Sequence, residues 1–318
     1  MQYQTTLSPD EPIVITIGNF DGIHKGHQRL MHELHVMAEA LHCLPVVVTF
    51  QPHTLMVVRP EIYVQYLTTL EEKLALASKY GQIARSIVIS FTPQVSAMSA
   101  QEFMDTLCKD FQIRGLVVGA NFSLGRNRMG DTTFLEQYGQ EHNIQVRIIS
   151  LEESEQVRIS STRIRALVTD GHIEDANELL GHPVVINGIV RHGDERGRLL
   201  GFPTANLHPD PHKLLPANGV YAVRVRIKDQ EEVGSDSNNA PTVYNGVANI
   251  GVRPTFNGKE RLVEVHLLDV NLDLYEKRLS VDFIARLRNE QRFSGIDALK
   301  TQIASDVERA RQILAIGG

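Results

Sequence analysis

The chain has 318 residues, more than one hydrophobic core usually organises, so we expect two domains. Its hydrophobic content of 42% and charged content of 22% are typical of a globular protein whose cores need no disulfide or metal cross-links. The net charge of −6 provides no basic surface for nucleic acid or for an anionic membrane, and we expect neither partner.

The cysteines and the first residues predict the compartment. Cys43 and Cys108 lie in unrelated sequence contexts, which argues against a disulfide framework and against a thiolate zinc site. Residues 1–12 lack the basic and apolar pattern of a signal peptide, and no apolar run approaches the roughly 20 residues that a membrane helix needs. We therefore expect a cytoplasmic protein.

Residues 1–182 alternate short apolar runs with amphipathic stretches. The runs are rich in Val and Ile and lack polar alternation, as in strands buried on both faces of a parallel sheet. The expected strands are Ile13–Ile17, Val46–Phe50, Ile87–Phe91, Leu116–Gly119 and Val146–Leu151. Helices are expected at Gly26–Leu41, at Glu71–Tyr80 and after a capping box formed by Ser99 and Glu102. This alternation predicts a doubly wound α/β domain.

Residues 183–318 follow a different pattern, which begins near Gly181. Their segments alternate with period two and are separated by Gly, Pro, Asn and Asp, which is typical of an antiparallel barrel or sandwich. The expected strands are Val184–Val190, Tyr221–Ile227, Val243–Ile250, Leu262–Leu268 and Leu279–Ile284. A last helix is expected at about Ile296–Leu314.

The stretch Ile15–His27 leads from a buried strand through a glycine-rich turn into the start of a helix. Ligands of open α/β sheets bind at the carboxyl ends of strands, where this turn lies. Gly18 and Gly22 allow close approach of the backbone to a ligand. His24 and His27 can face one point beside the helix N-terminus, which suits charge that develops on phosphate oxygens. The alternatives are a chance histidine pair and a metal pair, for which no third ligand is evident nearby.

A second element, Arg158–Arg165, follows the last strand of the same domain. Ser161 or Thr162 can cap the helix that begins there, while Arg163 and Arg165 can reach a polyphosphate. Taken alone, this element favours the interpretation as a capped helix with solvated arginines. In one sheet with the histidine turn, it indicates a pyrophosphate-binding element of an adenylyl-transfer site.

The sequences GNFDGIHKGH and ISSTRIR together resemble the His-x-Gly-His nucleotidyltransferase superfamily, in the form found in the FAD synthetase part of bacterial bifunctional riboflavin kinase/FAD synthetases. VVGANFSLG and TFQPH resemble two further blocks of that family. The resemblance implies that the FMN phosphate attacks the α-phosphorus of ATP directly, with His24 and His27 as catalytic groups. The ATP and phosphate contacts that it implies are Gly18, Asn19, Phe20, Asp21, His24, His27, Asn121, Ser161, Thr162, Arg163 and Arg165.

The segment Gly188–Asn206 is rich in Gly and Arg and contains no Walker motif. Its glycines permit a loop that folds over an anion with backbone N–H groups turned inward. Thr204 and Asn206 offer the hard oxygens that Mg²⁺ prefers. The alternative is a surface hairpin.

The sequences GFPTANL, GVYAV, GVANIGVRPTF and VEVHLLD occur in the order seen in riboflavin kinases, and the resemblance covers nearly all of residues 183–315. It implies a small antiparallel barrel with a C-terminal helix, Glu264 as the catalytic base and Arg288 as a flavin contact. The ATP and phosphate contacts that it implies are Gly188, Gly193, Arg198, Thr204 and Asn206, the last two also as Mg²⁺ ligands. Alternatively, Glu264 belongs to the polar face of a strand and Arg288 is a solvated helix charge.

The leading hypothesis is a bifunctional enzyme that uses ATP to phosphorylate riboflavin to FMN and then to adenylylate FMN to FAD, with Mg²⁺ as cofactor. This sequence departs from the FAD synthetase pattern at Gln51, Thr54 and Thr92, and it lacks an acidic residue at Ala120 and Asn121. These departures motivate a second hypothesis, a riboflavin kinase with an inactive N-terminal domain. A third hypothesis is a flavin-binding regulator without turnover.

Overall fold

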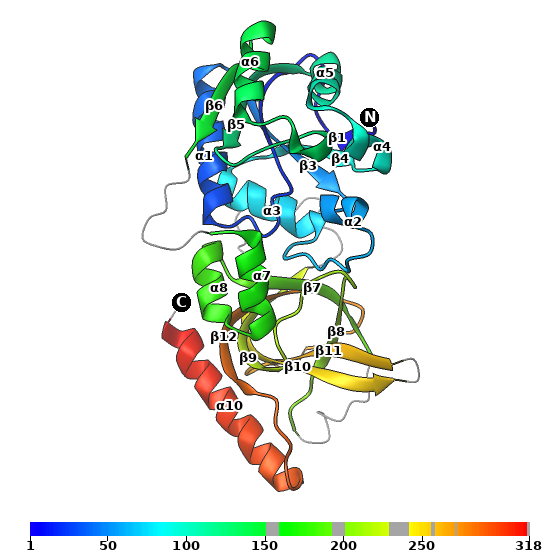
Figure 1. Ribbon diagram of the computed structural model, residues 1–318. Helices are drawn as coiled ribbons and strands as arrows, with labels where there is room; N and C mark the ends of the chain where they lie inside the picture. The colour runs from blue at the N-terminus through cyan, green and yellow to red at the C-terminus, as the bar shows by residue number, and fades with distance from the viewer. Residues whose placement is uncertain (151–158, 193–200, 229–241, 256–257, 271, 317–318) are drawn as a thin grey trace. The chain divides into compact units, whose positions relative to one another are not determined.

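The computed structural model describes residues 1–318 except 151–158, 193–200, 229–241, 256–257, 271 and 317–318 (Figure 1). The chain divides into two compact units, Met1–Ser161 and Thr162–Gly318. This division agrees with the expectation of two domains, while the boundary between residues 182 and 183 stays a prediction. Gly193 and Arg198, two of the predicted phosphate contacts, lie outside the described residues.

The first unit is built on a parallel sheet with one antiparallel edge strand. The sheet has the order β1-β4-β3-β2-β5-β6, and β1 pairs antiparallel with β4. Its strands are β1 (Tyr3–Thr5), β2 (Pro12–Ile17), β3 (Leu44–Gln51), β4 (Arg85–Ser90), β5 (Gln112–Gly119) and β6 (Gln145–Ile149). Five of these strands match the predicted apolar runs. The three-residue β1 was not predicted, because so short a segment carries no readable period.

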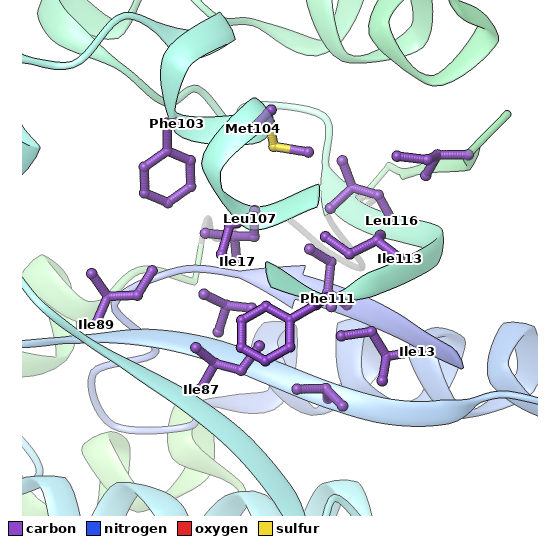
Figure 2. Close-up of a cluster of buried hydrophobic side chains, with 14 of the residues drawn as sticks. Ile13, Ile17, Ile87, Ile89, Phe103, Met104, Leu107, Phe111, Ile113 and Leu116 are labelled. Carbon is purple, nitrogen blue, oxygen red and sulfur yellow. The ribbon is translucent and has the colours of Figure 1, made fainter. Parts of the chain in front are cut away.

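Helices cover both faces of this sheet, which explains why its strands are apolar throughout. In β2, Ile13, Ile15 and Ile17 point to one face and Val14 to the other. Figure 2 shows the first face, where isoleucines from β2 and β4 pack against side chains of α5. The helices of this unit are α1 (Lys25–Ala40), α2 (Thr54–Val58), α3 (Leu70–Gly81), α4 (Pro93–Ala97), α5 (Ala100–Asp110) and α6 (Thr132–His142), with a 3₁₀ turn η1 (Arg126–Arg128). The doubly wound arrangement is therefore confirmed.

Two of these helices begin with complete capping boxes. The predicted box at α5 is present, since the Ser99 side chain accepts from the Glu102 N–H while the Glu102 carboxylate accepts from the Ser99 N–H. Thr69 and Glu72 form the same arrangement at the start of α3. The second box fixes where α3 begins, close to the glycine-rich turn described below.

The second unit is a closed antiparallel barrel with helices outside it, which confirms the predicted barrel. The strands follow the order β10-β11-β8-β7-β12-β9. They are β7 (Val184–Arg191), β8 (Ala205–Pro209), β9 (Gly219–Lys228), β10 (Val243–Thr255), β11 (Gly258–Leu267) and β12 (Arg278–Asn289). The unit also contains α7 (Ser161–Asp170) from its second residue onward, α8 (Ile173–Leu180) and the long α10 (Ile296–Ile316). Val307, Ala310 and Leu314 of α10 pack on the outside of the barrel.

Strand β8 corrects the expectation of a loop spanning Gly188–Asn206. Gly188 lies within β7, and Asn206 lies within β8. A Cβ atom at Gly188 would approach the His208 carbonyl oxygen to 2.7 Å, so this glycine is required by the neighbouring strand.

Among the helices in the described part of the chain, none combines the length and apolarity needed to cross a membrane.

Candidate active sites

The turn Gly18–Gly22 follows β2 at the carboxyl edge of the sheet and is called the glycine turn below. Its backbone has left-handed φ angles of 48° at Phe20 and 87° at Gly22, followed by 40° at Ile23. Phe20 is buried, and a Cβ atom at Gly18 would touch its ring at 3.0 Å. The turn thus folds its phenylalanine inward while its backbone stays at the sheet edge.

Asp21 holds the glycine turn to the segment that precedes α3. Its carboxylate is buried and accepts from the N–H groups of Leu67 at 3.1 Å and Thr68 at 3.0 Å. The Thr68 hydroxyl donates to the same carboxylate at 3.2 Å and accepts from the Gly22 N–H at 3.0 Å. Asp21 was predicted as an ATP contact, and its observed hydrogen bonds are those of a structural clamp.

The two predicted histidines lie side by side at the start of α1. His24 is the N-cap, and its Nδ1 accepts from the His27 N–H at 3.3 Å. The two rings stack with centroids 3.6 Å apart. Burial, the neighbouring His24 and the cation of Lys73 lower the pKa of His27 well below 6.5, so His27 is neutral at pH 7. Its Nδ1 is buried and has no hydrogen-bond partner among the described residues.

Ser161 connects the start of α7 to the glycine turn. Its hydroxyl donates to the Asp21 carbonyl oxygen at 2.8 Å, 140 residues away in the sequence. The structure therefore brings Ser161 to the glycine turn at Asp21, which lies three residues before His24 in the sequence. Thr162, Arg163 and Arg165 follow in the same helix and belong to the second unit.

A cavity of about 640 Å³ opens at the carboxyl edge of the sheet. Three predicted contacts, Gly18, Asn19 and Asn121, line it. Most of the remaining lining is apolar, and includes Phe50 at the end of β3 and Phe91 just after β4. Sequence reasoning missed these aromatic side chains as site residues, although their position at strand ends pointed to them.

A wider cavity of about 800 Å³ lies at the opposite edge of the sheet. Pro12, Gln112 and Gln145, which begin β2, β5 and β6, are among its lining residues. It contains none of the predicted site residues, and open α/β sheets bind ligands at the other edge. The smaller cavity is therefore the better candidate site.

Asn19 is held by one of the residues at which the sequence departs from the family pattern. Its Nδ2 donates to the Thr54 hydroxyl at 2.8 Å, and its Oδ1 accepts from the Thr54 N–H at 3.4 Å. A proline at position 54 has neither the N–H nor the hydroxyl. Thr92, another departure, caps α4 by accepting from the Val95 N–H at 3.4 Å. Both residues thus have defined structural roles.

Three polar side chains form a row across adjacent strands of the barrel. Glu264 of β11 pairs in register with Asn206 of β8 and Asn249 of β10, and the Asn249 Nδ2 donates to its carboxylate at 3.2 Å. Val263 and Val265, on either side of Glu264, point into the buried interior. The row is therefore on the outer face of the barrel, with Glu264 only partly buried.

Thr204 and Asn206 lie beside this row and fit a magnesium site in their donor chemistry. In the described part of the chain, neither side chain makes a hydrogen bond to protein, so the oxygens of both remain open to a ligand. No cluster of three or more His, Cys, Asp or Glu side chains suited to a metal occurs among the described residues. A site of few protein oxygens suits Mg²⁺, which usually takes its other ligands from water and substrate phosphates.

Arg288 lies on β12, so the alternative that it is a helix charge is wrong. Its Nε donates to both carboxylate oxygens of Asp306, at 3.0 and 2.9 Å, and Asp306 lies on α10. The guanidinium also lies 5.6 Å from the centroid of the Phe293 ring. These contacts join the barrel to α10.

Comparison with known proteins assigns both units. A family model described as FAD synthetase matches residues 7–163, and one described as riboflavin kinase matches residues 180–314. The chain is 39% identical over 315 residues to the bifunctional riboflavin kinase/FMN adenylyltransferase of Escherichia coli (strain K12), covering 99% of this chain and 96% of that protein. It is 38% identical over 304 residues to the protein of the same description from Pseudomonas fluorescens, covering 95% and 93%.

A solved structure described as a macrolide-efflux protein from Streptococcus pneumoniae has the same architecture. It aligns with a TM-score of 0.84 and 31% sequence identity, and covers 96% of each chain. The two family models match one part of the chain each, and the curated relatives cover nearly its full length. The chain belongs to the bifunctional riboflavin kinase/FMN adenylyltransferase family.

Proposed function

We propose that the two activities of this family reside in the two units of this chain, with the glycine turn serving FMN adenylylation and the row at Glu264 serving riboflavin phosphorylation. As a family member, the chain phosphorylates riboflavin to FMN and adenylylates FMN to FAD. The stacked histidine pair at the carboxyl edge of the sheet is the observation that supports the assignment of FMN adenylylation to the first unit.

In the adenylylation step, an oxygen of the FMN phosphate attacks the α-phosphorus of ATP, and pyrophosphate leaves. His24 and His27 stabilise the charge that builds on the phosphate oxygens, together with the N-terminus of α1. The buried Nδ1 of His27, which has no hydrogen-bond partner in the described part of the chain, supports this role, because a buried polar atom without a partner is rare unless a ligand completes it. Asn19 and Asn121 bind nucleotide and flavin, and Ser161, whose hydroxyl donates to the Asp21 carbonyl oxygen, binds the leaving pyrophosphate.

The cavity of about 640 Å³ beside Gly18 is the FMN site. Its aromatic and aliphatic lining suits the flat, apolar face of an isoalloxazine ring. In this proposal the FMN phosphate lies at the polar end of the cavity, at Gly18 and Asn19, from which it can attack an α-phosphorus.

In the kinase step, the 5′-hydroxyl of riboflavin attacks the γ-phosphorus of ATP, and ADP leaves. Glu264 accepts the hydroxyl proton, which its position on the partly exposed outer face allows. Thr204 and Asn206 would hold Mg²⁺, which neutralises phosphate charge when bound. Gly188 preserves the close pairing of β7 with β8. Arg288 contacts the flavin in this proposal, and its bonds to Asp306 join β12 to α10.

Three proposed properties rest on the sequence and the family together. Riboflavin, FMN and ATP are the small-molecule substrates, Mg²⁺ is the cofactor, and the cytoplasm is the compartment. Neither nucleic acid nor a membrane is a partner. Asn19 and its Thr54 contact favour an active adenylyltransferase over a kinase with an inactive first domain.

One incubation tests this function. Purified protein is mixed with riboflavin, ATP and Mg²⁺, and the products are resolved by chromatography. FAD formation is the expected result. Accumulation of FMN alone would identify a kinase with an inactive first unit, and unchanged riboflavin would identify a binding protein without turnover.

A further inference from the structure

Lys73 is a buried lysine that the proposed mechanism does not use. It lies in the second turn of α3 and exposes 5% of its surface. Asp21 clamps Leu67 and Thr68, the residues just before α3, to the glycine turn. This clamp sets the start of the helix and brings Lys73 to the carboxyl edge of the sheet.

The Lys73 ammonium is linked to the glycine turn through one hydroxyl. Its Nζ donates to the Thr49 Oγ1 at 3.2 Å, and Thr49 is fully buried in β3. The Thr49 hydroxyl in turn donates to the Asn19 carbonyl oxygen at 3.3 Å. The three groups form a chain of hydrogen bonds that ends on the backbone of the turn.

The positive charge of Lys73 is only partly compensated by the protein. Its ammonium has three protons, and in the described part of the chain it makes the one hydrogen bond to Thr49 and no ion pair. The charged or titratable groups that act on it or share its site are Asp21 in the turn, His24 at the N-cap of α1 and His27 in its first turn. The Asp21 carboxylate already accepts hydrogen bonds from Leu67 and Thr68.

A buried ammonium in such surroundings is held at an electrostatic cost. Burial lowers the pKa of Lys73 from 10.5 to about 8, and Asp21 offsets part of that effect. The same charge contributes to the lowered pKa of His27. A polyphosphate bound at the turn would supply the negative charge that this site lacks.

We propose that Lys73 is a positioning residue for adenylyl transfer: its buried ammonium holds the Asn19 end of the glycine turn through Thr49 and supplies the positive field that draws the ATP polyphosphate to the histidine pair. This role rests on the proposed function of the first unit. Lys73 acts through the turn and through its field, and it takes no part in bond making.

The pH profile of FMN adenylylation tests the proposal. For the wild type, kcat/KM for ATP with supplied FMN falls as pH rises through about 8, because the ammonium loses its proton there. Lys73→Arg retains its charge and keeps its rate to higher pH. Lys73→Met is about tenfold or more slower at pH 7, with a flat profile. Lys79→Met, an exposed lysine of the same helix, matches the wild type.

Two outcomes of that assay overturn the proposal: equal rates for wild type and Lys73→Met at pH 7, or identical profiles for wild type and Lys73→Arg. A wild type that makes no FAD would instead refute the proposed function.

A titration of the histidines by NMR tests the electrostatic effect of Lys73 independently of enzyme activity. The pKa of His27 rises by about half a unit or more in Lys73→Met if the charge acts as proposed. An unchanged His27 titration overturns it.

Discussion

Replacing Lys73 by Met removes a buried cation and should stabilise the first unit while impairing its activity. Lowering a lysine pKa from 10.5 to about 8 corresponds, at about 1.4 kcal/mol per unit, to about 3 kcal/mol of destabilisation by the charged form. The variant also loses the hydrogen bond to Thr49, a loss of about 1 kcal/mol. We expect a net gain of about 2 kcal/mol in unfolding free energy at pH 7.

The sign of the pH dependence separates this electrostatic effect from simple repacking. Below pH 8 the lysine is charged in both folded and unfolded chains, so the full destabilisation is present. Between pH 8 and pH 10.5 the unfolded chain binds more protons than the folded one, and stability therefore rises with pH. By pH 9.5 the remaining destabilisation is about 1 kcal/mol, so the advantage of Lys73→Met disappears.

Hydrogen exchange of amides in β2 and β3 measures the stability of the first unit apart from the barrel. Wild type and Lys73→Met are compared at pH 7 and again at pH 9.5, so that intrinsic exchange rates cancel. Lys79→Met serves as the control, because surface substitutions change stability by about 0.5 kcal/mol or less. A Lys73→Met variant that is less stable than the wild type at pH 7, or equally favoured at both pH values, would refute the reasoning.

Three further substitutions test the sites by their reactions. His27→Ala should lower FAD formation by about a hundredfold or more while FMN accumulates. The control His35→Ala, on the same helix, should leave FAD formation normal. Normal FAD output from His27→Ala would remove this residue from the mechanism. Glu264→Gln should lower FMN formation by about a hundredfold or more and leave the adenylylation of supplied FMN unchanged. The control Glu308→Gln, on α10, should leave both reactions unchanged. Equal loss of both reactions in Glu264→Gln would contradict separate sites. Thr54→Val should raise KM for ATP by up to about tenfold, because it loses the hydrogen bond that the Thr54 hydroxyl accepts from Asn19. Thr54→Ser keeps that hydroxyl and should leave KM unchanged. A Thr54→Ser variant with a KM as high as that of Thr54→Val would show that the hydroxyl does not determine KM.

The elements of the fold were predictable where the hydrophobic period is clear. The runs at Ile13–Ile17 and Val46–Phe50 lie within β2 and β3, because strands buried on both faces leave no polar positions. Strand β8 was not predicted, since its five residues are short and follow a Gly- and Arg-rich segment. Arg288 shows the related limit, because the sequence alone did not distinguish a polar strand position from a helix position.

The residues of the candidate sites were likewise predictable only where a local sequence pattern contains them. His24 and His27 were found because both lie within one local motif, three residues apart. Lys73 was not found, because it follows Glu71 and Glu72 in an amphipathic helix and has the sequence context of a surface lysine. Its burial depends on the clamp from Asp21 to Leu67 and Thr68, a contact across 46 residues that no local pattern encodes.

The two proposed phosphate sites, one in each unit, have physically different surroundings. At the glycine turn, left-handed residues, a neutral histidine and a partly compensated ammonium lie together in a buried region, where electrostatic interactions are strong and costly. At the barrel, Glu264 and its asparagine neighbours lie on a partly exposed face, where a metal ion can supply the positive charge when substrate binds. The proposed adenylylation site thus takes part of its positive charge from the buried cation of Lys73, whereas the proposed kinase site would take it from Mg²⁺.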